Sequence, residues 1–258
     1  MRTLQKQLNT RLTSADIQTF TSSGTWTKPS GFPSTAMVLI QGWGAGASGG
    51  FNTNATTRAG GGGGGSYREV WKPLSELGAT ETVTIGAGGA SQAVSNTAGV
   101  NGGNTTFGAH LTARGGTGGN VSAAGEADGG AGGGLFATAA TGTRSNDVTW
   151  EEGWGALSTV DTPGYFGNTI GGGGGAAGTI SGSAGGSSVY GGGGGGGVKH
   201  GGTNGAGGSS VYGGAGSAGA ATGTSASGTQ PGGGGGGNAG GTASGAGGDG
   251  KCVVTVFY

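Results

Sequence analysis

SSVYGGGGGGGVKHGG, residues 187–202, contains seven consecutive glycines at residues 191–197, between a tyrosine and a Val-Lys-His run. Uninterrupted glycine tracts of similar length recur at residues 60–65, 171–175 and 232–237. Flexible linkers do not need to agree in length, whereas rods packed side by side do. A polyproline II strand rises by about 3.1 Å per residue, so the seven glycines would span roughly 22 Å. We therefore interpret the four tracts as rods of similar height.

Glycine is the residue that such a bundle requires. A polyproline II strand makes no hydrogen bonds within itself, so its N–H and C=O groups point outward. Without a Cβ atom, neighbouring rods can approach closely and bond to one another in several directions. Ordering the backbone costs about 1–2 kcal/mol per residue, and glycine is at the upper end of that range. The sequence predicts that a cooperative set of backbone hydrogen bonds, closed by a β core, compensates for this cost.

The composition favours an ordered protein. Of the 258 residues, 75 are glycine and 17 are aromatic, and Lys plus Arg equals Asp plus Glu at 11 each. Disordered chains are usually highly charged and poor in aromatic residues. A net charge of zero gives no electrostatic basis for nucleic-acid binding, and the lack of a long apolar run argues against membrane insertion. The single cysteine, Cys252, excludes an internal disulfide framework, and we expect synthesis in a reducing cytoplasm.

Strand-like runs occur at both ends of the chain and predict a compact β core. They are IQTF, GTWTKP, AMVLIQGW, SYREVW, ETVTIG, a run at residues 105–113, and the closing KCVVTVFY. We expect residues 17–113 to form this core with the first rod, residues 114–250 to form the rod bundle with its loops, and residues 251–258 to close the core. The predicted fold is mainly β and irregular: a strand core and packed polyglycine II helices joined by variable loops, with a short N-terminal helix.

Residues 1–16 have helical spacing, because Leu4, Leu8 and Leu12 recur every fourth residue and would share one face. A helix of this length with three leucines is too short to be stable alone in water. We expect it to fold against a partner as a docking or oligomerisation segment, with a frayed terminus as the alternative. Three leucines are compatible with a homotrimer.

A local repeat lies inside the rod region. AGGSSVYGG at residues 184–192 recurs at residues 206–214, a period of 22 residues that is typical of stacked structural units. Tyr190 and Tyr212 hold equivalent positions in the repeat, and we expect them to pack at the ends of rods.

Motifs that resemble catalytic sites lack their structural context. Residues 44–49 match G-x-G-x-x-G after a strand, but the following FNTNATTRAGGGGGG cannot form the helix that a dinucleotide site needs. Residues 245–252 resemble a P-loop in which Cys252 replaces the Ser or Thr that holds Mg²⁺. His110 and His200 have no nucleophile or carboxylate close in sequence. We expect no enzyme activity, no cofactor and no metal site.

FTSSGTWTKPSG at residues 20–31 and MVLIQGWGAGASGG at residues 37–50 resemble the opening of the glycine-rich domain in bacteriophage tail fibres. GGGGGGSYREVW, NGGNTTFGAHLTARGG and DGKCVVTVFY fit the same pattern, so the resemblance covers residues 17–258. The tracts are similar to those of the distal adhesins of T4-like phages, in which polyglycine II rods form a packed sandwich.

The resemblance implies a receptor-binding protein at the distal tail or tail-fibre tip of the virion. Its receptor would be an outer-membrane protein or a polysaccharide of the bacterial surface. It also implies that another tail or fibre protein binds the N-terminus. Residues 1–16 are short for an anchoring domain, which leaves open whether the protein caps a separate fibre or attaches directly to the tail.

If the rods are a scaffold, specificity resides in the loops that join them. Residues 135–170 are the richest candidate because they hold several aromatic residues, which bind sugar rings and protein loops alike. Their alternative role is a small satellite core. Shorter candidate loops lie at residues 51–59, 199–200 and 217–231. The candidate receptor-binding residues are Phe51, Arg58, Phe136, Arg144, Trp150, Trp154, Tyr165, Phe166, Lys199 and His200.

Two other functions fit a bundle of glycine rods. An ice-binding protein would present rows of short Thr or Ala side chains on a flat face, whereas the loops here are long and aromatic. A structural fibre component, or an assembly factor absent from the mature particle, would need no loop chemistry at all.

Overall fold

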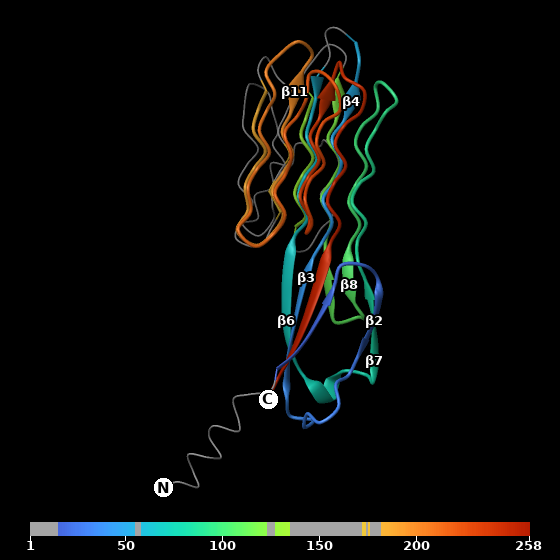
Figure 1. Ribbon diagram of the computed structural model, residues 1–258, viewed down its shortest axis with the longest axis vertical. Coiled ribbons are helices and arrows are strands. Elements are labelled where there is room, and N and C mark those ends of the chain that lie inside the picture. The colour runs from blue at the N-terminus through green and yellow to red at the C-terminus, as the bar shows by residue number, and fades with distance from the viewer. Residues whose placement is uncertain (1–14, 55–57, 123–126, 135–171, 174, 176–181) are drawn as a thin grey trace.

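The computed structural model describes residues 15–54, 58–122, 127–134, 172–173, 175 and 182–258. These residues form an elongated molecule, with a β-sandwich at one end and a bundle of extended, glycine-rich segments at the other (Figure 1). We call these extended segments rods. The described chain is mainly β, as the sequence predicts, and its one helical element is the 3₁₀ turn η1 (Leu74–Glu76).

Two four-stranded antiparallel sheets form the sandwich. The first has the order β1 (Ala15–Phe20), β13 (Lys251–Phe257), β3 (Met37–Trp43) and β6 (Tyr67–Pro73). The second has the order β2 (Gly24–Thr27), β7 (Thr80–Thr84), β8 (Thr105–Phe107) and β9 (Leu111–Ala113). Because β13 lies between β1 and β3, the first and last strands of the described chain meet in one sheet.

Side-chain alternation along these strands builds the core. Val38 and Ile40 of β3 and Val254 of β13 are fully buried and belong to one apolar cluster with residues of the second sheet. On that sheet, Trp26 and Phe107 make an edge-to-face contact with ring centroids 5.6 Å apart. The sandwich is therefore an ordinary hydrophobic core.

The prediction of a helix over residues 1–16 is wrong for the last two residues, 15 and 16, which form part of a strand. Ala15 and Asp16 are the first residues of β1, where they pair with Phe257 and Val256 of β13. Without β1, this edge of β13 would keep unpaired backbone groups, so strand pairing prevails over the local leucine pattern. The three leucines that define the helical pattern lie outside the described residues: Leu4, Leu8 and Leu12.

Several rods continue the strands of the sandwich. β3 leads into a rod at residues 44–50, and rods at residues 60–65 and 245–250 lead into β6 and β13. The G-x-G-x-x-G match in the first of these is therefore extended and opens no helix. Further rods lie at residues 86–89, 99–103, 114–120, 128–133, 183–186, 192–197, 205–208, 214–219, 225–229 and 232–237, and described parts of another at residues 172–173 and 175.

The rod at residues 60–65 hydrogen-bonds to its neighbours with a period of three residues. Successive N–H groups donate in rotation to three different rods, at residues 114–120, 172–173 and 232–237. The donor and acceptor pairs are Gly60 with Asn120, Gly63 with Thr117, Ser66 with Arg114, Gly64 with Gly173, Gly62 with Gly235, and Gly65 with Gly232, at N···O distances of 2.8–3.0 Å. Each row of donors therefore points to its own side of the rod.

The carbonyl groups of this rod accept from three other rods, at residues 44–50, 128–133 and 192–197. The donor and acceptor pairs are Gly50 with Gly60, Ala47 with Gly63, Gly130 with Gly61, Gly133 with Gly64, Gly192 with Gly65, and Gly195 with Gly62, again at 2.8–3.0 Å. The rod is thus hydrogen-bonded to six surrounding rods, three through its donors and three through its acceptors.

The tracts at residues 60–65, 191–197 and 232–237 are buried along their whole length and lie against one another. They bond in a cycle: Gly195 donates to Gly62, Gly62 donates to Gly235, and Gly234 donates to Gly193, each at 2.8 Å. No strand of a sheet makes bonds in so many directions, because sheet bonding is confined to two edges. The three glycine tracts form the centre of the bundle.

Buried hydroxyl groups replace backbone acceptors within the rods. Ser48 Oγ accepts the N–H of Val100 at 2.8 Å, and Thr117 Oγ1 accepts that of Ala131 at 2.6 Å. Ser217 Oγ accepts the N–H of Gly236 at 2.7 Å. Rod positions that carry a side chain thus use small residues, and serine and threonine there satisfy a neighbouring donor.

The 22-residue repeat corresponds to two adjacent paths through the bundle. Ser188 and Ser210, at equivalent repeat positions, form a parallel β-bridge. The hydroxyl groups of Ser187 and Ser209 lie 3.1 Å apart. Each repeat therefore stacks on the next in register, which confirms the predicted stacking.

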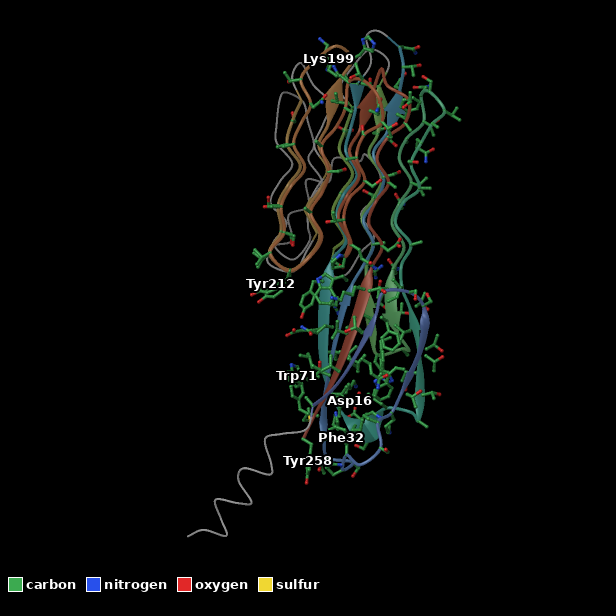
Figure 2. The ribbon with its side chains drawn as sticks, in the orientation of Figure 1. Asp16, Phe32, Trp71, Lys199, Tyr212 and Tyr258 are labelled. Atoms are coloured by element: carbon green, nitrogen blue, oxygen red, sulfur yellow. The ribbon has the colours of Figure 1, made fainter. Side chains whose placement is uncertain are left out.

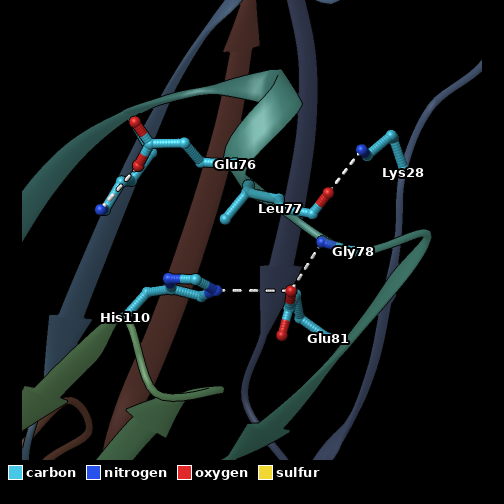
Figure 3. A network of polar contacts seen from close by, with 7 residues as sticks. Lys28, Glu76, Leu77, Gly78, Glu81 and His110 are labelled. Atoms are coloured by element: carbon cyan, nitrogen blue, oxygen red, sulfur yellow. Dashed lines mark hydrogen bonds and ion pairs between the residues drawn. The ribbon is translucent and has the colours of Figure 1, made fainter.

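A polar network holds η1 against the second sheet at the base of the sandwich (Figure 3). Glu81 Oε1 accepts the N–H of Gly78 at 2.8 Å and lies 3.4 Å from Nε2 of His110. Lys28 Nζ donates to the carbonyl of Leu77 at 2.6 Å. His110 has a carboxylate partner that is distant in sequence, and the network ties together two turns and a strand.

Gly64→Ala is expected to prevent folding or to lower the melting temperature strongly. Its Cβ would overlap the carbonyl group of Gly192, which the surrounding rods hold in place. Overpacking lowers the free energy of unfolding by about 1–3 kcal/mol where side chains can shift. Here the Cβ would meet backbone atoms, which shift less easily, so we expect a loss of about 3 kcal/mol or more. Thermal unfolding followed by circular dichroism measures the effect. Gly24→Ala is the control, because a Cβ there has its nearest neighbour, the Phe20 ring, at 3.7 Å; equal melting temperatures would contradict rod packing.

Cys252 is expected to react with a thiol reagent only when the protein unfolds. The residue is fully buried in the sandwich, and burial raises the pKa of its thiol to about 12. The reactive thiolate is therefore scarce at pH 8 in the folded state. Colorimetric thiol titration should show no reaction in buffer and complete reaction in guanidinium chloride. Rapid reaction in buffer would contradict the buried position of β13.

Candidate functional site at the loop-bearing end of the rods

The ends of the rods farthest from the sandwich, here the distal end, carry short paired segments and the loops that join them. The segments are β4 (Phe51–Asn52), β5 (Arg58–Ala59), β10 (Val121–Ser122), β11 (Val198–Lys199) and β12 (Asn238–Ala239). Lys199 lies at this end, whereas Asp16, Phe32 and Tyr258 lie at the opposite end of the molecule (Figure 2). The paired strands β1 and β13 and the distal loops are therefore separated by the full length of the bundle.

A small apolar cluster closes the bundle beneath these loops. Ala59, Val198 and Ala239 are fully buried there, and Val121 and Ala221 pack against them. The cluster joins β5, β10, β11 and β12, so the loops start from fixed positions.

Phe51 does not offer its ring to a receptor. The side chain is only 2% exposed, and the residue pairs with Asn238 of β12 and bridges Thr97. Its large apolar side chain is buried under the loops, and phenylalanine is among the residues most often buried in folded proteins. Phe51 is therefore a supporting residue of the distal end, and the prediction of a contact role for it is corrected.

Arg58, Lys199 and His200 are brought together at the distal end. Arg58 and Lys199 are direct partners in the antiparallel pair of β5 and β11, and both are partly exposed. The next residue, His200, lies against Gly240, which has a φ of 106° and no room for a Cβ beside the imidazole. The structure thus gathers three basic side chains from two loops that are about 140 residues apart in sequence.

A second set of distal side chains, on β4 and the loop at residues 95–96, is polar and neutral. Asn52 is fully buried; its Oδ1 accepts from Ser95 Oγ at 3.2 Å and its Nδ2 donates to Asn96 at 3.3 Å. Ser95 Oγ also accepts the N–H of Thr53 at 3.0 Å. Asn96 adopts a φ of 61°, a left-handed conformation that asparagine tolerates better than most residues. These contacts fix the loop at residues 94–97 to β4.

Asn238 organises two further distal loops, and sequence reasoning missed it. Its buried amide Nδ2 donates to the carbonyls of Gly223 and Ala243 at 2.9 and 2.8 Å, and its Oδ1 accepts the N–H of Gly241 at 2.8 Å. The sequence does offer one signal for this role: Asn238 is the first residue after the glycine tract at residues 232–237. A polar side chain at that position can bond to the turn in which the rod ends.

Six predicted contact residues lie outside the described residues: Phe136, Arg144, Trp150, Trp154, Tyr165 and Phe166. The described residues that precede and follow their segment lie at the sandwich end of the bundle. Gly133 donates to Gly64 at 2.8 Å and Gly172 donates to Gly133 at 3.2 Å, close to Ser66 where the chain enters β6. Gly133 and Gly172 therefore lie at the end opposite to Lys199.

The family model described as a glycine-rich domain matches residues 18–257. The chain belongs to this glycine-rich domain family. A search of curated proteins finds no match to the chain. The match spans the sandwich and the rods together, so both belong to one glycine-rich domain.

In this glycine-rich domain, Tyr190 and Tyr212 are packing residues, as predicted. Their rings stack with centroids 4.8 Å apart, and Tyr190 stacks on Tyr67 of β6 at 5.1 Å. Tyr67 contacts Trp43 at 5.0 Å, and Trp43 Nε1 donates to the carbonyl of Tyr190 at 2.8 Å. The stack joins the ends of two rods to the sandwich.

The described part of the glycine-rich domain holds no cluster of three or more His, Cys, Asp or Glu that could bind a metal ion. No helix within the described ranges is long and apolar enough to cross a membrane.

Asn238→Ala is expected to loosen the distal loops while leaving the sandwich intact. The change removes a buried amide and its hydrogen bonds to two carbonyls and one N–H of partly exposed turns, at a cost of about 0.5–1.5 kcal/mol for each bond lost. Hydrogen exchange with mass spectrometry should show faster exchange at residues 220–224 and 240–243. Thr222→Ala, at an exposed position, is the control. Unchanged exchange in both variants would contradict the organising role of Asn238.

Proposed function

We propose that this glycine-rich domain is the receptor-recognising tip of a bacteriophage tail or tail fibre. In this proposal the rods are polyglycine II helices that form a rigid scaffold, and their loops contact a structure on the surface of the bacterial host. The protein acts by binding and catalyses no reaction.

The hydrogen-bond pattern supports the polyglycine II conformation of the rods. A helix with three residues per turn directs every third N–H to the same side, and the central rod donates to three neighbours with that period. Six neighbours around one rod correspond to hexagonal packing of threefold helices. A scaffold of this kind is stiff because its central rods are restrained on all sides.

The observation that carries the proposal is the position of the distal loops relative to the paired strands β1 and β13. Ala15 pairs with Phe257 at the sandwich end, whereas Lys199 lies at the distal end (Figure 2). An attachment through the sandwich end would therefore leave the distal loops pointing away from the particle. Loops on a rigid scaffold are the usual location of binding residues.

The side chains at the distal end suit polar, anionic surface structures. Arg58 and Lys199 provide positive charge, and arginine in particular matches carboxylate and phosphate groups with two parallel hydrogen bonds. Ser95 and Asn96, which are exposed on another distal loop, add neutral donors and acceptors. Surface polysaccharides and acidic loops of outer-membrane proteins both present such groups. Another tail or fibre protein would bind at the sandwich end and residues 1–14.

Binding to whole cells tests the proposal. The full chain, fused at its N-terminus to a fluorescent protein, is incubated with a panel of bacterial strains and measured by flow cytometry. On a strain that binds, the double variant Arg58→Ser, Lys199→Ser is expected to weaken binding about tenfold or more, which corresponds to at least about 1.4 kcal/mol.

The matched control is the double variant Lys72→Ser, Lys251→Ser, which removes the same charge from the sandwich. It should bind as the unaltered chain does. The proposal is wrong if no strain binds above the fluorescent protein alone, or if both double variants bind equally well. Thermal hysteresis in the same preparation would instead identify an ice-binding protein.

A further inference from the structure

One short sheet at the distal end places two cations side by side. β5 lies between β10 and β11, and the register pairs Ser122 with Arg58 and Arg58 with Lys199. The neighbouring register row of the same strands belongs to the apolar cluster beneath the loops: Val121, Ala59 and Val198. Because side chains alternate along a strand, Ser122, Arg58 and Lys199 share the opposite face of this sheet. We call these three residues the basic row, and Lys199 marks its end of the molecule in Figure 2.

The basic row is partly exposed and lacks a counter-charge among the described residues. Both ion pairs within the described ranges lie in the sandwich, so Asp128, which begins a neighbouring rod, is paired with neither Arg58 nor Lys199. Like charges directly opposite each other on neighbouring strands are destabilising, because their Cβ atoms are only about 4.5–5.5 Å apart. The pairing of Arg58 with Lys199 therefore has a cost that a bound anion would remove.

A phosphate monoester matches the basic row better than a carboxylate does. It carries a charge of about −1.5 to −2 at pH 7 and has three acceptor oxygens. Two of these oxygens can accept the parallel N–H groups of the Arg58 guanidinium, and the third can accept from the Lys199 ammonium. Ser122 Oγ, on the other side of Arg58, can donate a further hydrogen bond. A carboxylate has one charge and two oxygens, which a single arginine already satisfies.

We propose that the basic row binds a phosphate group carried by a surface polysaccharide of the bacterial host. This inference rests on the proposed function and deepens it, because it selects one of the two receptor classes that an anionic ligand allows. Unmodified protein loops offer carboxylates, whereas the hydroxyl groups of a polysaccharide can carry phosphate esters. His200 follows Lys199 in the turn, but its imidazole lies against Gly240 and is not part of the row.

Amide chemical shifts in solution NMR test the site with four small probes. The isotope-labelled full chain is titrated with glucose 6-phosphate, glucuronate, glucose and inorganic phosphate at constant ionic strength. Glucose 6-phosphate is expected to shift the amides of Ser122, Arg58 and Lys199. Glucuronate, the carboxylate counterpart, should bind several-fold more weakly, and glucose should leave these amides unmoved. Inorganic phosphate lacks the sugar ring and should bind more weakly than the sugar phosphate.

Neutral substitutions locate the contacts. Arg58→Gln and Lys199→Gln are each expected to weaken glucose 6-phosphate binding about tenfold or more, because each removes a hydrogen bond to a charged group. Ser122→Ala should weaken it less, since it removes a neutral donor. Neither Gln variant is expected to lower the melting temperature, because each also removes the repulsion between the pair. Lys72→Gln removes the same charge from the sandwich and should leave the affinity unchanged.

Three titration results would overturn the inference. Equal affinity for glucose 6-phosphate and glucuronate would show that the row does not select phosphate and would favour an acidic protein loop as the ligand. Inorganic phosphate that binds as tightly as the sugar phosphate would show an anion site without a saccharide ligand. Unchanged affinity in both Gln variants would place the contact outside the basic row.

Competition on whole cells separates this inference from the proposed function. On a strain that binds the fluorescent fusion, glucose 6-phosphate is expected to reduce binding, and glucuronate at the same ionic strength is not. Cell binding that glucose 6-phosphate does not reduce would contradict phosphate recognition and leave receptor binding intact. Phosphate-selective binding of the probes without binding to any strain would support the phosphate contact and contradict the proposed function.

Discussion

Backbone hydrogen bonding between rods that lack a Cβ atom is the interaction on which this molecule depends. In a sheet, a strand bonds to at most two neighbours and its side chains fill the other directions. The rod at residues 60–65 bonds to six neighbours, and a methyl group on Gly62, Gly63 or Gly64 would overlap the carbonyl of an adjacent rod. The glycine content is therefore a packing requirement, and the buried backbone groups of the rod find partners on all sides.

The β-sandwich is the second requirement, because the rods carry few apolar side chains with which to form a core. Ordering so many glycines is entropically costly, and the rods gain mainly backbone bonds in return. The strands β3, β6 and β13 run directly into or out of rods, so the hydrophobic core around Val38 and Val254 holds those rods in register. Tyr190 and Tyr212, stacked on Tyr67, fasten two rod ends that no strand continues.

Much of the architecture could be predicted from the sequence, whereas the contacts at its ends could not. Glycine tracts of similar length and apolar strand runs predicted rods and a β core, because both signals are local. The pairing of Ala15 with Phe257 is a contact across the whole chain, which the local leucine spacing cannot reveal. Phe51 illustrates a second limit. An aromatic residue beside a loop can either contact a receptor or be buried beneath the loop, and only the packing of the folded chain shows which of the two it does. The gathering of Arg58 with Lys199 depends on how separate rods pair, so composition gave no sign of it.

The division between rods and loops determines where this molecule can change. A residue of a central rod contacts backbone on all sides, so even a methyl group has no place beside Gly64. A loop residue above the cluster of Ala59, Val198 and Ala239 meets solvent, and its exchange leaves the rod hydrogen bonds intact. Rods of six or seven residues hold the loops roughly 20 Å beyond the sandwich, given about 3.1 Å per residue. Changes in these distal loops are thereby kept apart from the paired strands β1 and β13 at the opposite end, which an attachment would use.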